Sequence, residues 1–472
     1  MFFQHIYEKG LAQASYLIGC QRTGEAIVID PRRDIDVYLE IAEKEKLRIT
    51  KITETHIHAD FLSGTRELAT ATNAEVLLSD EGGADWEYQF KHTSLKDGSV
   101  FKVGNLRFEV LHTPGHTPEH ISFLLTDTAA SDKPIMIFTG DFVFVGDVGR
   151  PDLLEKAAGI QGTRIIGAKQ MFNSLKRFKV LPDYVQVWPG HGAGSACGKA
   201  LGAVPSSTVG YEKLVNWALQ IDDEEKFVEA LLDGQPEPPK YFAMMKKLNK
   251  VGPNILGGIP HPARLTLSQF ENAVKENLTI VDTRNKLSFA GGHVPGSINI
   301  QDNSAFSTWA GWILDYEKPF ILIAHDHRVE ELTKQLIRIG LDNIDGYLSD
   351  IDGWANLGHE LETVNQMTCS ELSRNMEENS VNVIDVRGYS EYNSGHLPNA
   401  KNIHVGYILD NLDSIPKDKD LVVHCASGDR SSIAASLLLS KGFKNVTNLT
   451  GGFSNWANNG FEILKEENLV TT

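Results

Sequence analysis

The second half of the chain contains one sequence pattern twice. Residues 280–300 read IVDTRNKLSFAGGHVPGSINI, and residues 383–403 read VIDVRGYSEYNSGHLPNAKNI, with an aspartate and a histidine at matched positions. In each copy a strand pattern, a polar loop, a second apolar strand and an amphipathic helix follow in turn, which is the order of a parallel α/β sheet. The repeat therefore predicts two similar α/β domains in tandem.

Only the second copy carries a cysteine at the end of a strand. The segment DLVVHCASGDRSSIAASLLLSKGF predicts an apolar strand, a six-residue loop from Cys425 to Arg430, and a helix. Such a loop wraps its backbone N–H groups around the sulfur, and the helix N-terminus and Arg430 stabilise a thiolate or persulfide anion. We expect Cys425 to be a nucleophile and Arg430 its cationic partner. A buried structural cysteine is the alternative.

The first copy reads FILIAHDHRVEELTKQL in the corresponding segment, and no cysteine occurs between Cys197 and Cys369. This copy cannot form an enzyme persulfide, so we interpret it as a packing or interface module. His325, Asp326 and His327 leave a binding role open. Because a domain without catalytic residues offers its surface for assembly, we expect a homo-oligomer, either a dimer or a tetramer.

Both copies resemble rhodanese domains, and the resemblance covers almost all of the second half. Related phosphatases share the strand, loop and helix but have one more loop residue. The spacing C-x₄-R from Cys425 to Arg430 therefore favours sulfur transfer over phosphate chemistry.

Metal-binding residue types gather at strand ends in the first half of the chain. The segment THIHADFLSG follows an apolar strand pattern and places His56, His58 and Asp60 at alternate positions. Alternate side chains of an extended chain project to the same side, so these three can converge. Imidazole and carboxylate together suit a first-row transition metal. For one histidine alone, a polar loop that caps backbone groups is the alternative.

Three further clusters end other apolar runs. They are HTPGHTPEH with His112, His116 and His120, FTGD with Asp141, and VWPGHG with His191. Loops at the ends of neighbouring strands meet at one edge of a sheet, so we expect a single metal site. Short β-rich runs with a few helical stretches, continuing to about residue 233, predict a layered α/β domain.

The order HxHxD, PGH, TGD, PGH resembles the metallo-β-lactamase superfamily over roughly the first half of the chain. The resemblance implies a four-layer αββα sandwich with metal bound at one edge of the two sheets. Hydrolytic members of the glyoxalase II type carry HxHxDH, whose last histidine helps to hold a second metal. Here that position is Phe61, which argues against a two-metal hydrolase.

Within the superfamily, the HAD segment, FTGD and GRPD at residues 149–152 most resemble the persulfide dioxygenases. In that family one Fe(II) is held by two histidines and an aspartate, which correspond here to His56, His116 and Asp141. Two histidines and one carboxylate leave three positions open on Fe(II), enough for a thiolate-like substrate and O₂. The resemblance therefore implies one Fe(II) per chain.

Other polar residues are expected around this site. We expect His58, Asp60 and His191 to orient ligands or to contact substrate. Arg150 is expected either to pair bidentately with a carboxylate or to meet an anionic substrate. Cys197, flanked by small residues in GAGSACGK, either reaches the metal pocket and carries sulfur or is a tolerated small side chain.

The 472 residues are too many for one hydrophobic core. Residues 234–262 are rich in Pro and Gly and predict a linker with one helical piece, YFAMMKKLNK. The predicted domains are residues 1–233, 263–364 and 365–472. A formal net charge of −17 argues against nucleic acid and anionic membranes as partners. Without a signal peptide or a membrane-spanning apolar run, we expect a cytoplasmic protein.

These observations predict a non-heme iron persulfide dioxygenase coupled to a sulfurtransferase. The chain resembles the persulfide dioxygenase–rhodanese fusions of bacterial sulfide detoxification. That resemblance implies small thiol persulfides and O₂ as substrates, and sulfite and thiosulfate as products. Two alternatives remain: a zinc-dependent glyoxalase II-type thioester hydrolase with an appended rhodanese domain, and a non-enzymatic scaffold that only binds sulfur.

Overall fold

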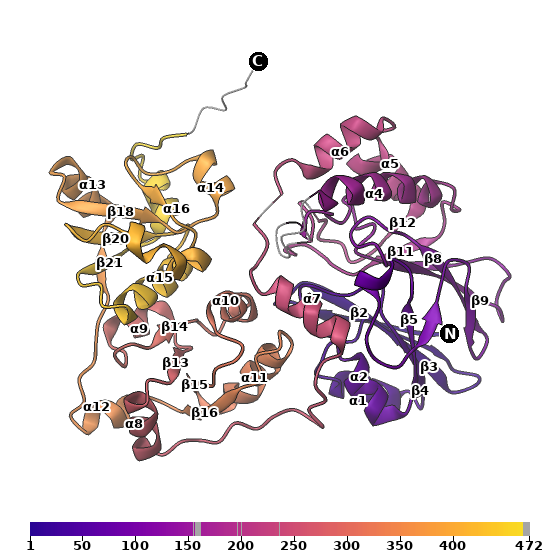
Figure 1. Ribbon diagram of the computed structural model, residues 1–472, viewed down its shortest axis with the longest axis horizontal. Helices are drawn as coiled ribbons and strands as arrows, with labels where there is room; N and C mark the ends of the chain where they lie inside the picture. The colour runs from indigo at the N-terminus through magenta and orange to yellow at the C-terminus, as the bar shows by residue number, and fades with distance from the viewer. Residues whose placement is uncertain (154, 156–161, 196, 200, 236, 466–472) are drawn as a thin grey trace. The chain divides into compact units, whose positions relative to one another are not determined.

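The computed structural model describes residues 1–153, 155, 162–195, 197–199, 201–235 and 237–465 (Figure 1). The end of the predicted third domain, residues 466–472, lies outside the described residues. The chain forms two compact units, one of residues 1–260 with 334–340 and one of residues 261–333 with 341–472. Among the described helices, none combines the length and the apolar character needed to cross a membrane.

Two six-stranded sheets form the centre of the first unit. The first sheet consists of β1 (Phe2–Glu8), β2 (Gln13–Cys20), β3 (Glu25–Ile29), β4 (Arg48–Thr53), β5 (Glu75–Ser79) and β6 (Thr93–Leu95), in that order. The second has the order β12 (Ser207–Thr208), β11 (Gln186–Pro189), β10 (Met136–Gly140), β9 (Ile121–Asp127), β8 (Leu106–His112) and β7 (Val100–Val103). One buried cluster joins residues of both sheets, including Tyr16, Ile27, Phe108 and Phe123. The sheets therefore pack face to face.

Helices cover the outer face of each sheet. On the first sheet, α1 (Asp36–Lys44) and α2 (Thr65–Thr72) pack through Tyr38 and Leu68. On the second sheet lie α4 (Thr163–Lys179), α5 (Val209–Val215), η2 (Trp217–Leu219) and α6 (Glu224–Leu232). The predicted four-layer αββα sandwich is confirmed.

The predicted linker contains a helix that belongs to the first unit. Helix α7 (Phe242–Val251) buries Asn249, whose side chain is 1% exposed. The Asn249 amide donates to the backbone carbonyls of His58 and Phe61, both at 2.8 Å, and accepts from the N–H of Ser63 at 2.9 Å. Helix α7 thus holds the loop in which the first metal-binding residue types occur.

The second unit contains two parallel sheets, one for each copy of the repeat. The first sheet has the order β14 (Ile298–Asn299), β13 (Thr279–Asp282), β15 (Phe320–Ile323) and β16 (Ile344–Leu348). The second has the order β17 (Asn365–Met367), β21 (Val446–Leu449), β20 (Asp420–His424), β18 (Val381–Asp385) and β19 (Lys401–Asn402). Both copies therefore form the predicted parallel α/β domains.

Helices surround these two sheets. In the first copy they are α8 (Leu267–Lys275), α9 (Lys286–Gly291), α10 (Phe306–Ile313), η3 (Asp326–Arg328), α11 (Val329–Ile337) and α12 (Asp352–Asn356). In the second copy they are α13 (Cys369–Glu377), α14 (Tyr389–Ser394), η4 (Val405–Tyr407), η5 (Leu409–Ser414), α15 (Asp429–Ser440) and α16 (Gly452–Asn458).

The repeated sequence pattern builds the same ion pair in both copies. Asp282 accepts from the guanidinium of Arg284, with Nε–Oδ1 at 3.0 Å, and Asp385 accepts in the same way from Arg387 at 3.0 Å. Each arginine also donates to the carbonyl of a glycine eight residues later. The Asp-x-Arg spacing that both copies share therefore builds the same set of contacts at the ends of strands β13 and β18.

The two copies share one hydrophobic core. Phe289 and Ala290 of α9 belong to the same buried cluster as Ile433 and Leu437 of α15, and Trp309 of α10 packs against it. This cluster makes the two copies one packed body.

Candidate metal centre and sulfur site

Three of the predicted metal ligands meet at the edge of the first unit. The ligand atoms of His56, His116 and Asp141 lie within 4.8 Å of one another, and all three side chains are buried. Asp141 Oδ2 lies 3.5 Å from His116 Nε2 and 4.0 Å from His56 Nε2. Each residue follows the end of a strand, β4, β8 or β10, so the sheet edges bring them together.

The other ring atom of each histidine already has a partner. Nδ1 of His56 lies 3.0 Å from the hydroxyl of Thr55, and Nδ1 of His116 lies 2.9 Å from the carbonyl of Arg150. These contacts leave Nε2 of both rings directed at Asp141. His56 Nε2 and Asp141 Oδ2 are buried without a hydrogen-bond partner in the described part of the chain. Since a buried unpaired polar group costs about 1–3 kcal/mol, this donor set fits a bound metal ion.

The protonation states agree with metal binding. Burial lowers the pKa of His56 well below its usual range, and the neighbouring histidines lower it further. Burial also lowers the pKa of His116. Although burial alone raises the pKa of Asp141, His191 and His116 hold it below its ordinary value. The group thus presents neutral imidazoles and a carboxylate, the forms that bind metals.

His120 positions Asp141 rather than joining the donor group. Its Nε2 accepts the backbone N–H of Asp141 at 3.1 Å, and its Nδ1 lies 2.9 Å from the hydroxyl of Thr113. A side chain at Gly140 would collide with both His120 and Thr55. The TGD glycine is therefore required for this close approach. The segment HTPGHTPEH makes His120 a candidate but indicates no role for it.

The ring of His58 contacts Asp30 instead of the donor group. Its Nε2 lies 3.1 Å from Asp30 Oδ1. Although burial disfavours the charged ring, the Asp30 carboxylate raises the pKa of His58 to about 9. The ring of Phe61, buried at 1% exposure, packs 4.4 Å from that of His58 between centroids. His58 thus lies outside the donor group, as we expected, and Phe61 is an apolar wall.

A second group of donors lies beside the first. The ligand atoms of Asp60, His191 and Cys197 also lie within 4.8 Å of one another, and His191 Nε2 is 3.3 Å from Asp60 Oδ2 and 3.5 Å from Asp141 Oδ1. Burial raises the pKa of the Cys197 thiol well above its usual range, as do the carboxylates of Asp141 and Asp60. Cys197 therefore reaches the metal pocket, as a thiol.

Arg150 pairs with a carboxylate. Its Nε and Nη2 donate to the two carboxylate oxygens of Asp152, both at 2.7 Å, and the arginine is fully buried. Of the two predicted roles of Arg150, the geometry matches the bidentate pair. Because the Arg150 carbonyl also contacts His116, the pair holds the GRPD segment against a donor of the metal group.

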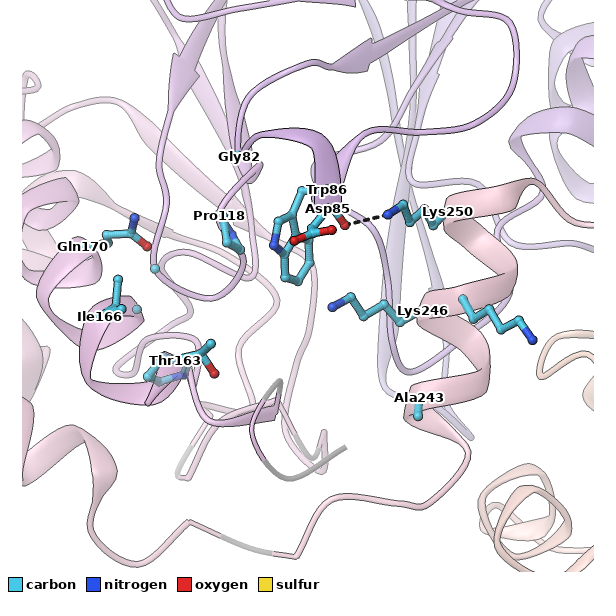
Figure 2. Close-up of a pocket in the computed structure, with 14 residues that line it drawn as sticks. Gly82, Asp85, Trp86, Pro118, Thr163, Ile166, Gln170, Ala243, Lys246 and Lys250 are labelled. Atoms are coloured by element: carbon cyan, nitrogen blue, oxygen red, sulfur yellow. Dashed lines mark hydrogen bonds between the residues drawn. The ribbon is translucent and has the colours of Figure 1, made fainter. Parts of the chain in front are cut away.

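A cavity of about 620 Å³ opens beside the loop that carries His116 (Figure 2). Gly115 and Pro118, which flank His116, line this cavity. Helix α7 contributes Lys246 and Lys250, which point toward the turn η1 (Ala84–Trp86). Lys246 Nζ lies 3.6 Å from the centre of the Trp86 ring. The cavity next to the candidate metal centre is thus lined by the cations Lys246 and Lys250 and by the aromatic ring of Trp86.

The second predicted site lies in the second unit. Cys425 follows β20 and is 1% exposed, and its Sγ accepts the backbone N–H of Gly428 at 3.1 Å. Ser431 Oγ lies 3.7 Å from the same sulfur. Both groups come from the loop and the first turn of α15, as the sequence predicted. The loop therefore surrounds the sulfur with donors that suit an anion.

Arg430 is tied to a carboxylate. Its Nη1 and Nη2 donate to Glu391 at 2.5 and 2.8 Å. Although burial lowers the pKa of Arg430, its hydrogen bonds to Glu391 and the nearby Cys425 raise it above the ordinary value. Glu391 in α14 was not predicted, since only the fold brings it to the loop.

In the first copy, Ala324 follows β15 at the position that Cys425 has after β20. The predicted binding residues His325, Asp326 and His327 are exposed. Within the described residues, no group of three metal donors includes them. This copy lacks the sulfur nucleophile, as we expected.

Comparisons with known proteins agree with this architecture. The model of the metallo-beta-lactamase superfamily matches residues 9–191, and the model of the rhodanese-like domain matches residues 266–357 and 368–459. The crystal structure of a metallo-beta-lactamase from Staphylococcus aureus subsp. aureus COL is 48% identical, covers 73% of this chain and 98% of that chain, and has a TM-score of 0.69. The chain belongs to the metallo-beta-lactamase superfamily. In this chain, two rhodanese-like domains follow the metallo-beta-lactamase domain.

Two curated relatives of the first half carry hydrolase names. A hydroxyacylglutathione hydrolase from Rhodospirillum rubrum is 33% identical over 176 residues, which are 37% of this chain and 60% of that protein. A probable polyketide biosynthesis zinc-dependent hydrolase from Bacillus velezensis is 26% identical over 224 residues, 47% of this chain and 88% of that protein. The domains of this chain are thus of enzyme type.

Proposed function

We propose that this chain is a non-heme iron persulfide dioxygenase whose last domain transfers sulfane sulfur. The observation that carries the proposal is the donor set of two imidazoles and one carboxylate, His56, His116 and Asp141. This set suits Fe(II) with open positions. His58 is held by Asp30, and Phe61 offers no donor.

The proposed reaction converts R–S–SH, O₂ and H₂O into R–SH and sulfurous acid, which ionises to sulfite. Fe(II), held by His56, His116 and Asp141, would supply open positions at which the persulfide and O₂ can meet, and the outer persulfide sulfur gives up the four electrons that reduce O₂. The chain itself orients the donors: Thr55 and the Arg150 carbonyl fix the two rings, and His120 fixes the backbone of Asp141. Phe61 and the buried surroundings keep bulk water from the site.

The cavity beside His116 favours a persulfide substrate whose carrier thiol has acidic groups. Lys246 and Lys250 place positive charge there in a chain whose net charge is −17. A carboxylate or phosphate of the carrier would bind Lys246, and an apolar part would lie on Trp86. Glutathione persulfide and coenzyme A persulfide both have this chemistry.

The first experiment is metal analysis combined with O₂ uptake. We expect about one iron per anaerobically purified chain and O₂ consumption that requires a thiol persulfide. His116→Ala should lose both iron and O₂ uptake. His112→Ala is the matched control, because His112 ends β8 just before the loop of His116 and its ring contacts the carbonyl of Pro118 instead of the donor group. An iron-free chain that consumes no O₂ with any persulfide contradicts the proposal.

A second experiment tests the cavity. Lys246→Met should raise KM for glutathione or coenzyme A persulfide by about tenfold, since charge-assisted hydrogen bonds are worth about 1.5–3 kcal/mol. It should leave KM for the uncharged persulfide of 2-mercaptoethanol unchanged. Equal effects on charged and uncharged carriers would show that Lys246 does not bind the acidic groups.

The alternative function is a zinc-dependent thioester hydrolase of the glyoxalase II type. It is favoured by the second donor group of Asp60, His191 and Cys197 and by the hydrolase relatives. It requires two metal ions per chain and turnover of an acyl thioester such as S-lactoylglutathione without O₂. Anaerobic hydrolysis by a two-zinc chain would establish this alternative in place of the dioxygenase.

For the last domain we propose sulfur transfer through Cys425. A persulfide on Cys425 passes its outer sulfur to sulfite, which becomes thiosulfate and leaves the Cys425 thiolate. The buried sulfur, the Gly428 N–H and Arg430 support this step. Cys425→Ser should raise the ratio of sulfite to thiosulfate among the products. An unchanged ratio would contradict the coupling of the two activities.

A further inference from the structure

A lysine of the cysteine-less copy reaches the loop around Cys425. Lys286, the first residue of α9, donates through Nζ to the carbonyl of Ser427 at 2.9 Å and to the carboxylate of Asp429 at 2.6 Å. Ser427 and Asp429 both belong to the loop from Cys425 to Arg430. The first copy thus supplies a charged contact to the sulfur site of the second copy.

The same contact lies directly beside the N–H group that faces the sulfur. Gly428, between the two residues that Lys286 binds, donates its N–H to Cys425 Sγ. Its φ of 110° is in the region that favours glycine. A Cβ on Gly428 would lie 3.2 Å from Lys286 Nζ. The Ser427 carbonyl and the Gly428 N–H belong to one planar peptide group, so holding the carbonyl toward Lys286 orients this N–H toward Cys425.

Lys286 also balances a negative charge at the site. Asp429 begins α15, and its carboxylate would repel a thiolate, a persulfide or a sulfite dianion bound at Cys425. The ion pair with Lys286 offsets this repulsion. The second copy has Tyr389 at the position in the repeat that corresponds to Lys286, so only the first copy supplies this charge.

A second contact from the first copy holds the helix itself. Asn299 in β14 accepts from the hydroxyl of Ser432 at 2.7 Å and donates its backbone N–H to the hydroxyl of Ser436 at 3.0 Å. Both serines are buried in α15, whose first turn follows the cysteine loop. The loop and the helix are therefore both held by the cysteine-less copy.

We infer that the cysteine-less copy completes the sulfurtransferase site, with Lys286 as the positioning residue of the Cys425 loop. This inference rests on the proposed role of Cys425 in sulfur transfer. It gives the first copy a role that needs no cysteine of its own. The first copy holds the Gly428 N–H at the sulfur and neutralises Asp429.

The test compares three variants of the full chain. In Lys286→Met the hydrogen bonds and the charge are lost, in Lys286→Arg both are kept, and Lys275→Met removes an exposed lysine of α8 as the matched control. The two readouts are sulfur transfer from a persulfide to sulfite and the rate of Cys425 alkylation by iodoacetamide as a function of pH, resolved by peptide mass spectrometry.

We expect Lys286→Met to lower kcat/KM for sulfur transfer about tenfold and to displace the alkylation curve of Cys425 to higher pH. Lys286→Arg should restore both readouts to within about twofold, since it keeps a cation with several donors. Lys275→Met should match the unmodified chain, and O₂ uptake should be unchanged in all three variants. Restoration by arginine also separates positioning from a general loss of folding.

Unchanged kcat/KM and an unchanged alkylation curve in Lys286→Met would overturn the inference. Equal losses in Lys286→Arg and Lys286→Met would overturn it as well, because a cation would then not be the required feature. If the unmodified chain transfers no sulfur, the proposed role of Cys425 fails. The alkylation curves still decide whether Lys286 positions the loop in that case.

Discussion

Replacing Asn249 by alanine should loosen the loop that carries His58 and Phe61. The Asn249 side chain supplies three hydrogen bonds to buried backbone groups, the carbonyls of His58 and Phe61 and the N–H of Ser63. Each group left without a partner costs about 1–3 kcal/mol, and local rearrangement recovers part of the sum. We expect the loop to lose about 3 kcal/mol of local stability.

Hydrogen–deuterium exchange on the full chain measures this loss locally, which a melting curve of a multidomain chain cannot do. A loss of about 3 kcal/mol makes exchange in residues 56–64 about 100-fold faster, because each factor of ten corresponds to about 1.4 kcal/mol. Lys247→Ala is the control, since Lys247 is exposed on the same helix and surface changes are worth about 0.5 kcal/mol or less. Equal exchange in Asn249→Ala and Lys247→Ala would refute the reasoning.

Further predictions concern the cavity, the metal centre and its wall. Burial lowers the pKa of Lys246 to about 8, although the nearby Glu119 opposes the shift. The other charged groups near Lys246 are Lys250 and Asp85. Because Lys246 is charged only below its pKa, KM for an acidic thiol persulfide should rise as the pH is raised through 8, and a flat KM would contradict this. Lys246→Arg should move the rise to higher pH, measured by steady-state O₂ uptake. Phe61→His should raise the metal content of chains produced with zinc from one toward two ions, measured by mass spectrometry of the metals; a constant content would show that Asp60 and His191 cannot complete a second site. Removal of the metal with a chelator should abolish O₂ uptake but leave sulfur transfer at Cys425 intact, and a parallel loss of both activities would be evidence against separate sites.

Local patterns predicted the parts of the structure that depend on neighbours in sequence. Metal-donor residue types at the ends of β4, β8 and β10 indicated a shared site because strand ends meet at a sheet edge. The cysteine loop was predicted for the same reason, since an apolar strand, a short loop and a helix leave few other geometries for Cys425. The repeat also predicted two parallel domains, because the same order of strand, polar loop, strand and helix recurs in both copies.

Contacts between distant segments could not be predicted in this way. Asn249 lies 186 residues from Ser63, and nothing in YFAMMKKLNK distinguishes it from an exposed asparagine. Lys286 lies 141 residues from Ser427, in a copy that was interpreted as a packing or interface module. Glu391 was likewise missed, although it holds Arg430. In each case one ordinary polar residue gains its role from the tertiary fold alone.

The hydrophobic core that joins α9, α10 and α15 has a consequence for how the second unit unfolds. Phe289 and Ala290 cannot leave this core without exposing Ile433 and Leu437 to water. The free energy of the shared surface therefore couples the two copies, and they should lose their structure in a single cooperative transition. A cysteine-less copy that unfolds together with its neighbour stabilises the copy that carries Cys425, so substitutions in either copy change the stability of both.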